Sequence, residues 1–598
     1  MRRPDLWTGA TLRAGMSDGR EDLRMRGGDP DFPVRDNAAA RDDRMTHRPG
    51  PGRVAFLAAI SLLFGTVGFL LYREVILSGP FLFDDFEYIV GNPMIKSLLY
   101  FTNITDPRYL GYLSFAVNYG LGGEDPFWFH LVNVIIHVMN ALLVFGVVKA
   151  VLTLSSSTGE RTADGHSAVA FFAALVFLVH PVETQAVSYI TQRFTSLSAL
   201  FYMLSVLLYL HARVRLEKES GKRRRGYEMY ILSMMSAVFA MKTKEIAFTI
   251  PFMVAILEFL LFEKSEYGKR RFYFLIPFAA MLIIIPLSLF GPEWGLSAPG
   301  SGIDEITRRD KLYDLSQRSP YEYLVTQFRV IVTYIRLLVF PVRQLAVYDY
   351  PASHSLFEPR VMLSLSLLLG IAGAAWYSWR KARRAAPGDA PYYRLFSIGV
   401  LWFFVTVSIE SSVIPIKDII FEHRLYLPSA GFFASCAGLL ILIVKRVRPF
   451  VFGRAVAAVI AVTVIAALSV ATYMRNTVWT DEVRFWDDVV QKTGKAIGYN
   501  NRGNAYLKKG QYALALRDLD RTIGFFPRAS DIMAWENSDF TPSNMAKTYM
   551  SRAQAYAQLG DRRRAQEDFE TANRIMKMPL GHVPGLTGRS ADVQGRTE

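Results

Sequence analysis

The chain has 598 residues, of which 51% are hydrophobic and 20% charged, and its mean hydropathy is +0.19. This length and composition exclude one soluble domain and favour a polytopic membrane protein with soluble parts. Lysine and arginine outnumber acidic residues by 68 to 53. This excess lies in short loops and in the N-terminal tail, so it indicates membrane orientation and not nucleic-acid binding. The single cysteine, Cys436, excludes intrachain disulfides, and we expect it to be a buried small hydrophobe within a span.

The first 52 residues are rich in Arg, Asp, Gly and Pro and lack periodic apolar positions. We therefore expect residues 1–52 to be a disordered, basic cytoplasmic tail without a cleavable signal sequence. Met45 is an alternative start, because the residues from Met45 to Arg53 already supply a positive flank for the first span.

Apolar runs long enough to cross a bilayer follow one another over residues 53–475, which we take as the membrane domain. They predict about eleven transmembrane helices, near 54–77, 131–154, 168–187, 195–212, 227–243, 246–262, 272–290, 361–379, 396–414, 427–444 and 455–473. Basic residues gather in alternate loops, at 213–225, 264–271, 380–394 and 445–454, which should face the cytoplasm. The remaining loops and the C-terminus then lie on the extracytoplasmic side.

A further apolar run at 324–340 does not fit this alternation, since its neighbours already place both of its ends on the extracytoplasmic side. It carries Arg329 and Arg336 seven residues apart, on one helical face. We expect an interfacial or re-entrant helix whose arginines meet headgroups or an anionic substrate. An ordinary span beside a wrongly assigned neighbour is the alternative.

The loop at 78–128 follows the first span and contains the adjacent carboxylates Asp84 and Asp85. Two solvated loop residues are the simple interpretation. Other polar residues, however, gather at span ends on the same predicted side: His180, Glu183, Gln192, Arg193, Lys242, Lys244, Glu245, Lys417, Asp418, Glu422, His423 and Arg424. Singly, each could be structural. Together they suit a phosphate held at the membrane surface beside a catalytic base.

After the last span, residues 476–580 have the composition of soluble helices and contain two similar segments, near 498–531 and 546–578. Gly503, Tyr506, Gly510 and Ala515 correspond to Ala553, Tyr556, Gly560 and Ala565, fifty positions later, which is the tetratricopeptide pattern with an insertion around 528–544. The segment 479–490 predicts an extra amphipathic helix. We expect this extracytoplasmic domain to bind a polypeptide, with a purely structural appendage as the alternative, and residues 581–598 to be a disordered tail.

Several separated motifs together resemble one family. They are Phe83-Asp84-Asp85, Tyr112 to Tyr119, Phe129 to Asn133 with His137, His180 to Val187, Lys244-Glu245, Tyr334 to Leu338, Tyr348 to Pro351, and Phe421 to Ser429. In this order they are similar to the transmembrane and tetratricopeptide-repeat O-mannosyltransferases and their bacterial relatives, within the GT-C class of glycosyltransferases. The resemblance covers residues 54 to about 577, and Glu422 to Pro428 is its most specific part.

The resemblance implies an all-α, GT-C-type membrane protein that transfers a sugar, mannose or a similar hexose, from a polyprenyl phosphate to an acceptor hydroxyl. Asp84 would be the general base, with Asp85 positioning the acceptor or sharing a metal, although either carboxylate could be the base. The expected phosphate contacts are Arg193, Lys244, Arg336, His423 and Arg424. The expected supporting residues are His180, Glu183, Glu245 and Glu422, the two carboxylates Glu183 and Glu422 orienting the cations. A divalent metal is an open question, since two adjacent carboxylates alone make a poor site for a hard cation.

Two other classes of function compete with this interpretation. One is a membrane-anchored scaffold whose repeats recruit extracytoplasmic partners; the other is a transporter, which would place charges in mid-span. The charges here lie at span ends, and the motifs around Asp84 and Glu422 are intact, which favours the enzyme. The short repeat array and Arg-rich short loops favour a bacterial inner membrane with periplasmic repeats. Membrane lipids and a protein or peptide acceptor are the expected partners, besides the donor.

Overall fold

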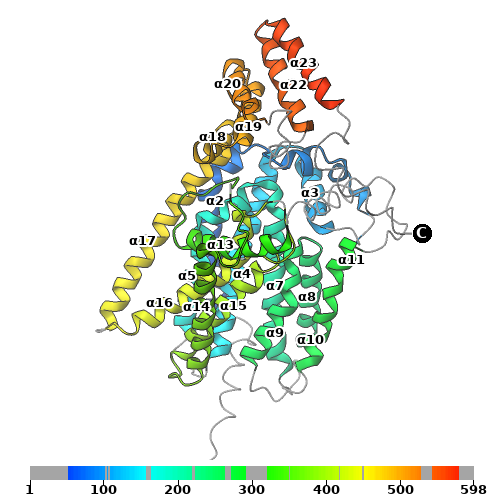
Figure 1. The fold of residues 1–598 in the computed structure, drawn as a ribbon. Helices are drawn as coiled ribbons and strands as arrows, with labels where there is room; N and C mark the ends of the chain where they lie inside the picture. Colours follow the sequence, from blue (N-terminus) through cyan, green and yellow to red (C-terminus); the bar gives the residue numbers. More distant parts are fainter. Residues whose placement is uncertain are drawn as a thin grey trace, which may run out of the picture.

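The computed structural model describes residues 51–577 except 102–103, 105–107, 157–162, 218–222, 263–270, 291–318, 349, 417, 448–449 and 527–541. Regular structure in these residues is entirely helical, which confirms the predicted all-α class (Figure 1). The expected tails, the alternative start at Met45 and most of the insertion between the repeats lie outside the described residues.

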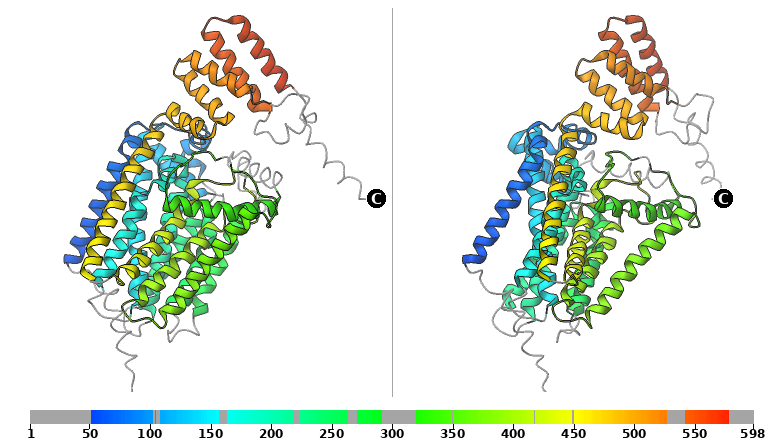
Figure 2. Two further views of the ribbon diagram at one scale, coloured as in Figure 1. Left: turned by 60° about the vertical axis from the view of Figure 1, so that its left-hand side comes forward. Right: turned by 90° about the vertical axis from the view of Figure 1, so that its left-hand side faces the viewer.

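The membrane domain is a bundle whose long helices run side by side (Figures 1 and 2). They are α2 (Pro51–Ser78), α4 (Pro126–Ser155), α5 (Ala163–Val179), α7 (Arg193–Leu216), α8 (Arg223–Met241), α9 (Ile250–Leu261), α10 (Arg271–Ala280), α11 (Ile284–Phe290), α14 (Pro359–Ala382), α15 (Ala390–Val407), α16 (Tyr426–Val444) and α17 (Phe450–Asn476). Their starts follow local rules; for example, the Asp125 side chain accepts the Phe127 amide at 3.0 Å while Pro126 opens α4.

Each predicted span is helical, but fewer than eleven helices are long and apolar enough to cross a bilayer alone. Among the described residues there are eight, or nine if the bent pair at 165–179 and 181–188 is one span. The two predictions that fail this test are those at 227–243 and 246–262. Three arginines open α8, and α9 has only 12 residues, so neither offers a full apolar window.

Helix α13 (Pro320–Val339) lies across the upper ends of the spans in both views of Figure 2. It is not among the candidate spans, as expected for an interfacial helix. Tyr323, Val330, Tyr334 and Leu337 form its buried face, whereas Arg336 is exposed. The run at 324–340 is therefore not an ordinary span.

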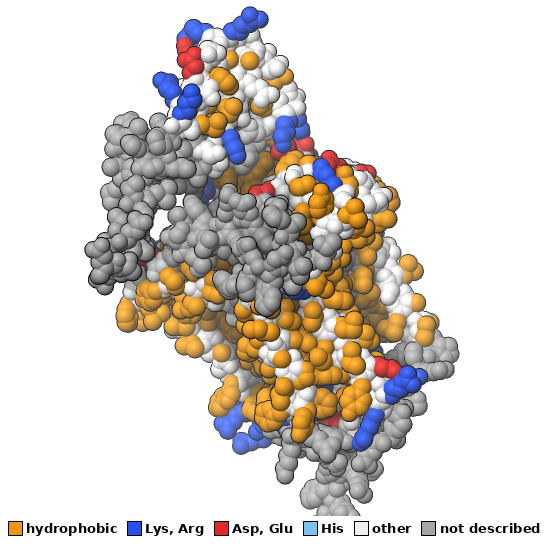
Figure 3. Space-filling view, turned by 90° about the vertical axis from the view of Figure 1, so that its right-hand side faces the viewer, with side chains coloured by type: hydrophobic (Ala, Val, Ile, Leu, Met, Phe, Trp, Pro, Cys, Tyr) orange, Lys and Arg blue, Asp and Glu red, His pale blue; other side chains and the backbone are white. Residues whose placement is uncertain are grey.

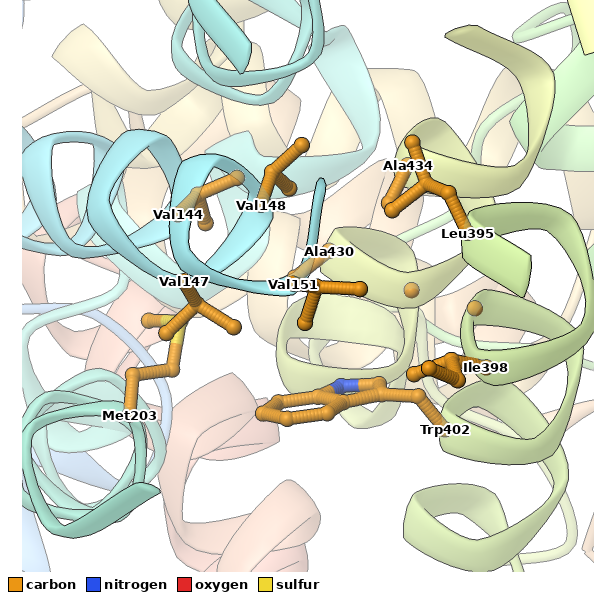
Figure 4. A pocket seen from close by; sticks show the side chains of 12 residues that line it. Val144, Val147, Val148, Val151, Met203, Leu395, Ile398, Trp402, Ala430 and Ala434 are labelled. Atoms are coloured by element: carbon orange, nitrogen blue, oxygen red, sulfur yellow. The ribbon is translucent and has the colours of Figure 1, made fainter. Parts of the chain in front are cut away.

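Helices α15 and α16 pack at very short range. A Cβ atom on Gly431 would lie 2.6 Å from the Gly399 carbonyl oxygen, so glycine is required at this crossing. A cavity of about 30 Å³ remains between these helices, α4 and α7, lined by apolar side chains with Trp402 along one side (Figure 4). The Trp402 indole donates to the Leu427 carbonyl at 2.9 Å. The cavity is roughly the size of one water molecule, so it is a packing defect and not a substrate site.

Hydrophobic side chains cover the sides of the bundle, and lysines and arginines gather at its lower end (Figure 3). The outward-facing side chains are apolar because lipid, not water, surrounds them. Cys436 belongs to this outer surface: it is exposed on α16, so the prediction that it is buried was wrong.

The C-terminal domain stands on the end of the bundle opposite the basic loops (Figures 1 and 2). Helix α18 (Glu482–Thr493) joins it to α17, and the pairs α19 (Ala496–Lys508) with α20 (Tyr512–Ile523) and α22 (Pro542–Gln558) with α23 (Arg562–Met576) follow. Gly510 and Gly560 make the turns within the two pairs at positive φ angles of 72° and 84°. The two predicted helical repeats are therefore present.

The same ion-pair arrangement recurs in both repeats. Arg502 forms a two-pronged pair with Asp518 and also contacts Asp487 of the preceding helix. Fifty residues later, Arg552 forms the same pair with Asp568 and contacts Asp520 of the preceding repeat. These arginines link each helical pair to the one before it.

Candidate functional site

The loop that follows α2 brings Asp84 and Asp85 to the same end of the bundle as the repeat domain (Figure 1). Both residues stand before the short π-helix η1 (Phe86–Val90). Phe83, immediately before them, has a φ angle of 53°, a left-handed conformation that costs energy in a phenylalanine. A strained residue directly before an acidic pair is typical of functional sites.

Asp85 is enclosed by the protein, with 1% of its surface exposed. One carboxylate oxygen accepts the Leu82 amide at 2.9 Å, and the other accepts the Thr191 amide at 2.8 Å together with the Thr191 hydroxyl. Burial raises the pKa of Asp85 to about 7, against the opposing effect of these hydrogen bonds. The Asp85 side chain therefore ties its loop to the start of α7.

Asp84 is held differently: its side chain is half-buried, and its backbone amide donates to the Tyr189 hydroxyl at 3.0 Å. A general base must reach its substrate, so the more accessible, half-buried member of the pair suits that role better than the enclosed one. The geometry favours Asp84 as the base and Asp85 as a structural anchor.

Three cations, Lys244, Arg424 and Arg108, lie around the His423 imidazole, and we call these four residues the cation cluster. The positive charges of Lys244, Arg424 and Arg108 all act on the His423 imidazole. Tyr88, one turn beyond Asp84 in η1, is in turn within electrostatic range of Arg108. The cluster thus lies beside the loop that carries the acidic pair.

Arg424 is 4% exposed, and its guanidinium donates only to two backbone carbonyls, those of Ile419 at 3.2 Å and Asp418 at 2.8 Å. No described carboxylate lies within ion-pair distance of it, although the charges of Glu410 and Asp418 act on it from farther away. The buried Nδ1 atom of the neighbouring His423 has no hydrogen-bond partner in the described structure. A buried cation without a carboxylate is costly unless an anion binds beside it.

The other two cations of the cluster have acidic partners. Lys244 lies 2.9 Å from Glu410 and donates to the Thr195 hydroxyl, also at 2.9 Å. Arg108 makes two 3.2 Å contacts to Glu245. Neither Arg108 nor Glu410 was expected from the sequence; the only signal for Arg108 was that Glu245, at a span end, needed a cation.

An apolar groove lies close to the Lys244 end of this cluster. Its volume is about 730 Å³, and the short helix η7 (Glu245–Thr249), α9, α15 and the residues just after α15 line it. The lining residues are Phe248, Thr249, Phe252, Ala255, Ile256, Phe259, Leu260, Leu401, Phe404, Val405, Ser408 and Ile409. Lys244 directly precedes η7 and Glu410 directly follows Ile409, so their ion pair marks the polar end of the groove.

Arg193, predicted to contact phosphate, is instead occupied by the protein. It is fully buried and donates to the side chains of Asn133 and Asn118 and to the carbonyls of Ser114 and Phe129. Its guanidinium also lies 4.5 Å from the centre of the Phe115 ring. The prediction for Arg193 is corrected on this evidence, because four acceptors and a ring leave little of it for a ligand.

Arg336 lies on the exposed face of α13 and donates to the Val342 carbonyl at 3.2 Å. Among the described residues, no hydrogen bond or ion pair joins Arg336 to the cation cluster. His180 contacts the Leu338 carbonyl at 3.2 Å and accepts the Val182 amide, so it ties α13 to the end of α5. The structure thus gives His180 a supporting role and Arg336 a position on the surface.

Glu422 and Glu183 are both fully buried, but neither lies against the cations that they were predicted to orient. Glu422 accepts the Gln344 side chain, the Leu345 amide and the Tyr348 hydroxyl, at 2.8, 2.7 and 2.6 Å. It therefore fixes the loop after α13 and, through the chain, the position of His423. Glu183 lies near Tyr72 and Tyr426 instead, and among the described ion pairs it has none.

Metal binding has little support from these positions. Within the part of the chain that the structure describes, no three His, Cys, Asp or Glu residues come together in a way that could hold a metal ion. Both carboxylate oxygens of Asp85 also accept hydrogen bonds from backbone amides. The two carboxylates of the acidic pair therefore do not point together at one metal position.

Known proteins resemble this chain in both of its parts. A family profile described as tetratricopeptide repeat matches residues 546–575. Protein O-mannosyl-transferase TMTC4 of Mus musculus is 30% identical over 226 residues, 34% of this chain and 30% of the mouse protein. TMTC1 of Mus musculus is 34% identical over 181 residues, 27% of this chain and 18% of that protein.

The protein O-mannosyl-transferase F38B6.6 of Caenorhabditis elegans matches a longer stretch, with 24% identity over 447 residues, 71% of this chain and 57% of the relative. The chain thus matches less than two thirds of the length of each of these relatives. The crystal structure of ArnT from Cupriavidus metallidurans bound to undecaprenyl phosphate aligns with a TM-score of 0.37 and 14% identity, over 77% of this chain and 81% of ArnT. A TM-score this low assigns no fold.

Proposed function

The chain is homologous to the TMTC protein O-mannosyl-transferases, and from this premise we propose that it is a GT-C-type membrane glycosyltransferase. It transfers mannose or a similar hexose from a polyprenyl phosphate to a hydroxyl of an acceptor, most simply a protein, on the side of the membrane that carries the repeats. The homology supports the class of reaction, and the geometry of the site supports the donor.

The observation that carries the donor assignment is the junction between the cation cluster and the apolar groove. Arg424 brings a buried charge without a described carboxylate partner, and Lys244 stands where the groove begins. A polyprenyl phosphate is a long hydrocarbon chain that ends in an anion. Its phosphate matches the cluster and its tail matches the groove, because each part meets the environment that it requires.

The chemistry follows from the same arrangement. Asp84 accepts the proton of the acceptor hydroxyl while that oxygen bonds to the anomeric carbon of the sugar, and the bond from this carbon to the phosphate oxygen breaks. The phosphate leaves with the electron pair, its charge is stabilised by Arg424 and Lys244, and the His423 imidazole can donate a hydrogen bond to it. The protein therefore supplies a base, an anion site and positioning.

We further propose that the site faces the periplasm of a bacterium. The repeats stand at one end of the bundle (Figure 2), and lysines and arginines gather at the other (Figure 3), as positive-inside orientation requires. An acceptor polypeptide held on the repeats would then be on the same side as Asp84. This supports a protein acceptor.

Sugar transfer from a panel of radiolabelled polyprenyl phosphate sugars, with membranes that contain the full chain, tests the proposal. We expect transfer by the wild type and a loss of at least about a thousandfold in the Asp84→Asn variant. Asp389→Asn, at the opposite end where Asp389 pairs with Lys445, is the matched control and should retain activity. Absence of transfer with every donor, combined with in vivo rescue of a deletion by Asp84→Asn, would instead establish the scaffold function.

A further inference from the structure

The strained residue beside the acidic pair requires a restraint. Phe83 has a φ angle of 53°, which is unfavourable for a residue that carries a side chain. This conformation persists only if neighbouring groups hold it. The backbone amides of Asp85 and Phe86 bond to the Leu82 and Phe83 carbonyls, so the turn that presents Asp84 depends on the conformation of Phe83. The backbone position of Asp84 therefore depends on the groups that hold Phe83.

The contacts that hold Phe83 come from the C-terminal domain as well as from the bundle. Its ring lies 5.8 Å from that of Trp486 and 6.1 Å from that of Tyr189. Tyr189 stacks on Trp479 with a 23° angle between the rings, and its hydroxyl accepts the Asp84 amide. Trp479 and Trp486 are 1% and 2% exposed, so this aromatic cluster is closely packed and excludes water.

Helix α18 also contacts the segment that leads to the cation cluster. Lys492 donates to the Gln344 carbonyl at 2.8 Å, and the Gln344 side chain donates to Glu422, next to His423. At its base, Asp488 pairs with Arg475 at 2.9 Å. One helix of the C-terminal domain thus contacts both the loop of the acidic pair and the segment that leads to the cation cluster.

We propose that Trp486 is a positioning residue for Asp84. Through its contact with Phe83, helix α18 fixes the position of the carboxylate that acts as base. The C-terminal domain therefore contributes to the active site. The catalytic consequence rests on the proposed function, whereas the restraint of the loop does not. Acceptor binding on the repeats would consequently be coupled to the position of the base.

Hydrogen–deuterium exchange of the full chain in detergent tests the restraint without any assay of activity. In Trp486→Ala, the amides of residues 82–91 should exchange about tenfold faster, while those of α15 and α16 keep their wild-type rates. Trp486→Phe retains a ring against Phe83 and should restore protection to within about threefold. Trp376→Ala, which removes a tryptophan that is 58% exposed on α14, is the matched control and should leave the loop unchanged.

Transfer kinetics of the same variants test the catalytic consequence. Trp486→Ala should lower kcat about tenfold with the donor KM within twofold of wild type, and Trp486→Phe should recover most of kcat. Unchanged exchange of residues 82–91 in Trp486→Ala would overturn the proposal, as would a loss expressed only in KM. If the wild type transfers no sugar, the proposed function fails while the exchange result still decides whether Trp486 restrains the loop.

Discussion

Two buried arginines at opposite ends of the bundle show how structural and functional charges differ. Arg213, in the lower part of α7, is 1% exposed and makes two contacts of 2.8 and 2.7 Å to Glu258, whose carboxylate also accepts the Tyr209 hydroxyl. Arg424 is almost as buried, but its described hydrogen bonds go only to backbone carbonyls. The first charge is neutralised by a direct ion pair, whereas the second has no described carboxylate within ion-pair distance, and in the proposed function it meets the donor phosphate.

This difference predicts that mutations at the two sites have opposite effects on stability and activity. Removing a group from a neutralised pair leaves a lone buried charge and destabilises the fold. Removing a cation that has no carboxylate partner costs little stability, because such residues are kept for function at some cost to the fold. Stability and activity should therefore separate cleanly between the two ends.

The largest effect is expected at the functional end. Arg424→Gln should lower kcat/KM for the polyprenyl phosphate donor by about a thousandfold, since the leaving phosphate loses its main counter-charge, while the melting temperature in detergent changes little. Arg424→Lys keeps a charge without the planar fork and should show a smaller loss. If kcat/KM of Arg424→Gln stays within threefold of wild type, Arg424 does not stabilise an anion in the reaction, and the contrast drawn with Arg213 is wrong.

The reverse pattern is expected at the other end. Glu258→Ala should destabilise the protein by about 3–5 kcal/mol, because Arg213 is left buried without its partner, yet the folded fraction should transfer sugar at the wild-type rate. Glu228→Ala is the matched control: Glu228 pairs with Arg224 on the exposed surface of α8, so its loss should cost less than about 1 kcal/mol. Denaturation midpoints of the two variants, compared with specific activity, separate the two effects.

The acidic pair repeats the comparison on a smaller scale, with Asp85 enclosed and Asp84 accessible. The pKa of Asp85 is raised to about 7 in the folded chain, so the folded state binds a proton that the unfolded state releases near pH 4. The stabilisation is thus complete at low pH and is lost as the pH rises to 7, on the order of 4 kcal/mol. Asp85→Asn stays neutral and should remove this dependence.

Exchange rates of residues 82–91 between pH 4.5 and 7.5, corrected for the intrinsic rate, measure that change in stability. The wild-type loop should lose protection as pH rises, and Asp85→Asn should not. Asp125→Asn, which alters an exposed N-terminal cap of α4, controls for the general effect of removing a carboxylate. A wild-type loop whose protection is independent of pH would show that Asp85 is ionised throughout.

Much of the architecture was predictable because it follows from local patterns. Apolar length marks the helices, the distribution of basic residues separates the two ends, and small residues with turn glycines mark the repeats. The sequence also placed Asp84 with Lys244, His423 and Arg424 on one side of the membrane. Each of these conclusions depends on a short stretch of chain or on counting spans.

The roles of individual cations were not predictable, because they depend on side chains from distant segments. Arg193 and Arg424 both lie at the start of a span and look alike in the sequence. Asn118 and Asn133, contributed by α3 (Tyr109–Gly122) and α4, occupy the first, and no described side chain oxygen occupies the second. Arg108 was missed for the same reason, since its partner Glu245 is 137 residues away.

The groove offers the finest test of the functional end, because it decides whether the lipid tail of the donor lies beside the Lys244–Glu410 ion pair. Ala255→Trp should fill part of the groove and raise the KM for a long-chain polyprenyl phosphate sugar about tenfold, while leaving kcat and the KM for a short-chain analogue unchanged. Ala374→Trp, on the outer face of α14, adds the same bulk elsewhere and should have no effect. Equal losses for long and short donors would place the obstruction at the phosphate and detach the tail from this groove. A loss confined to long donors would instead tie the cation cluster and the groove to one ligand, which neither feature establishes alone.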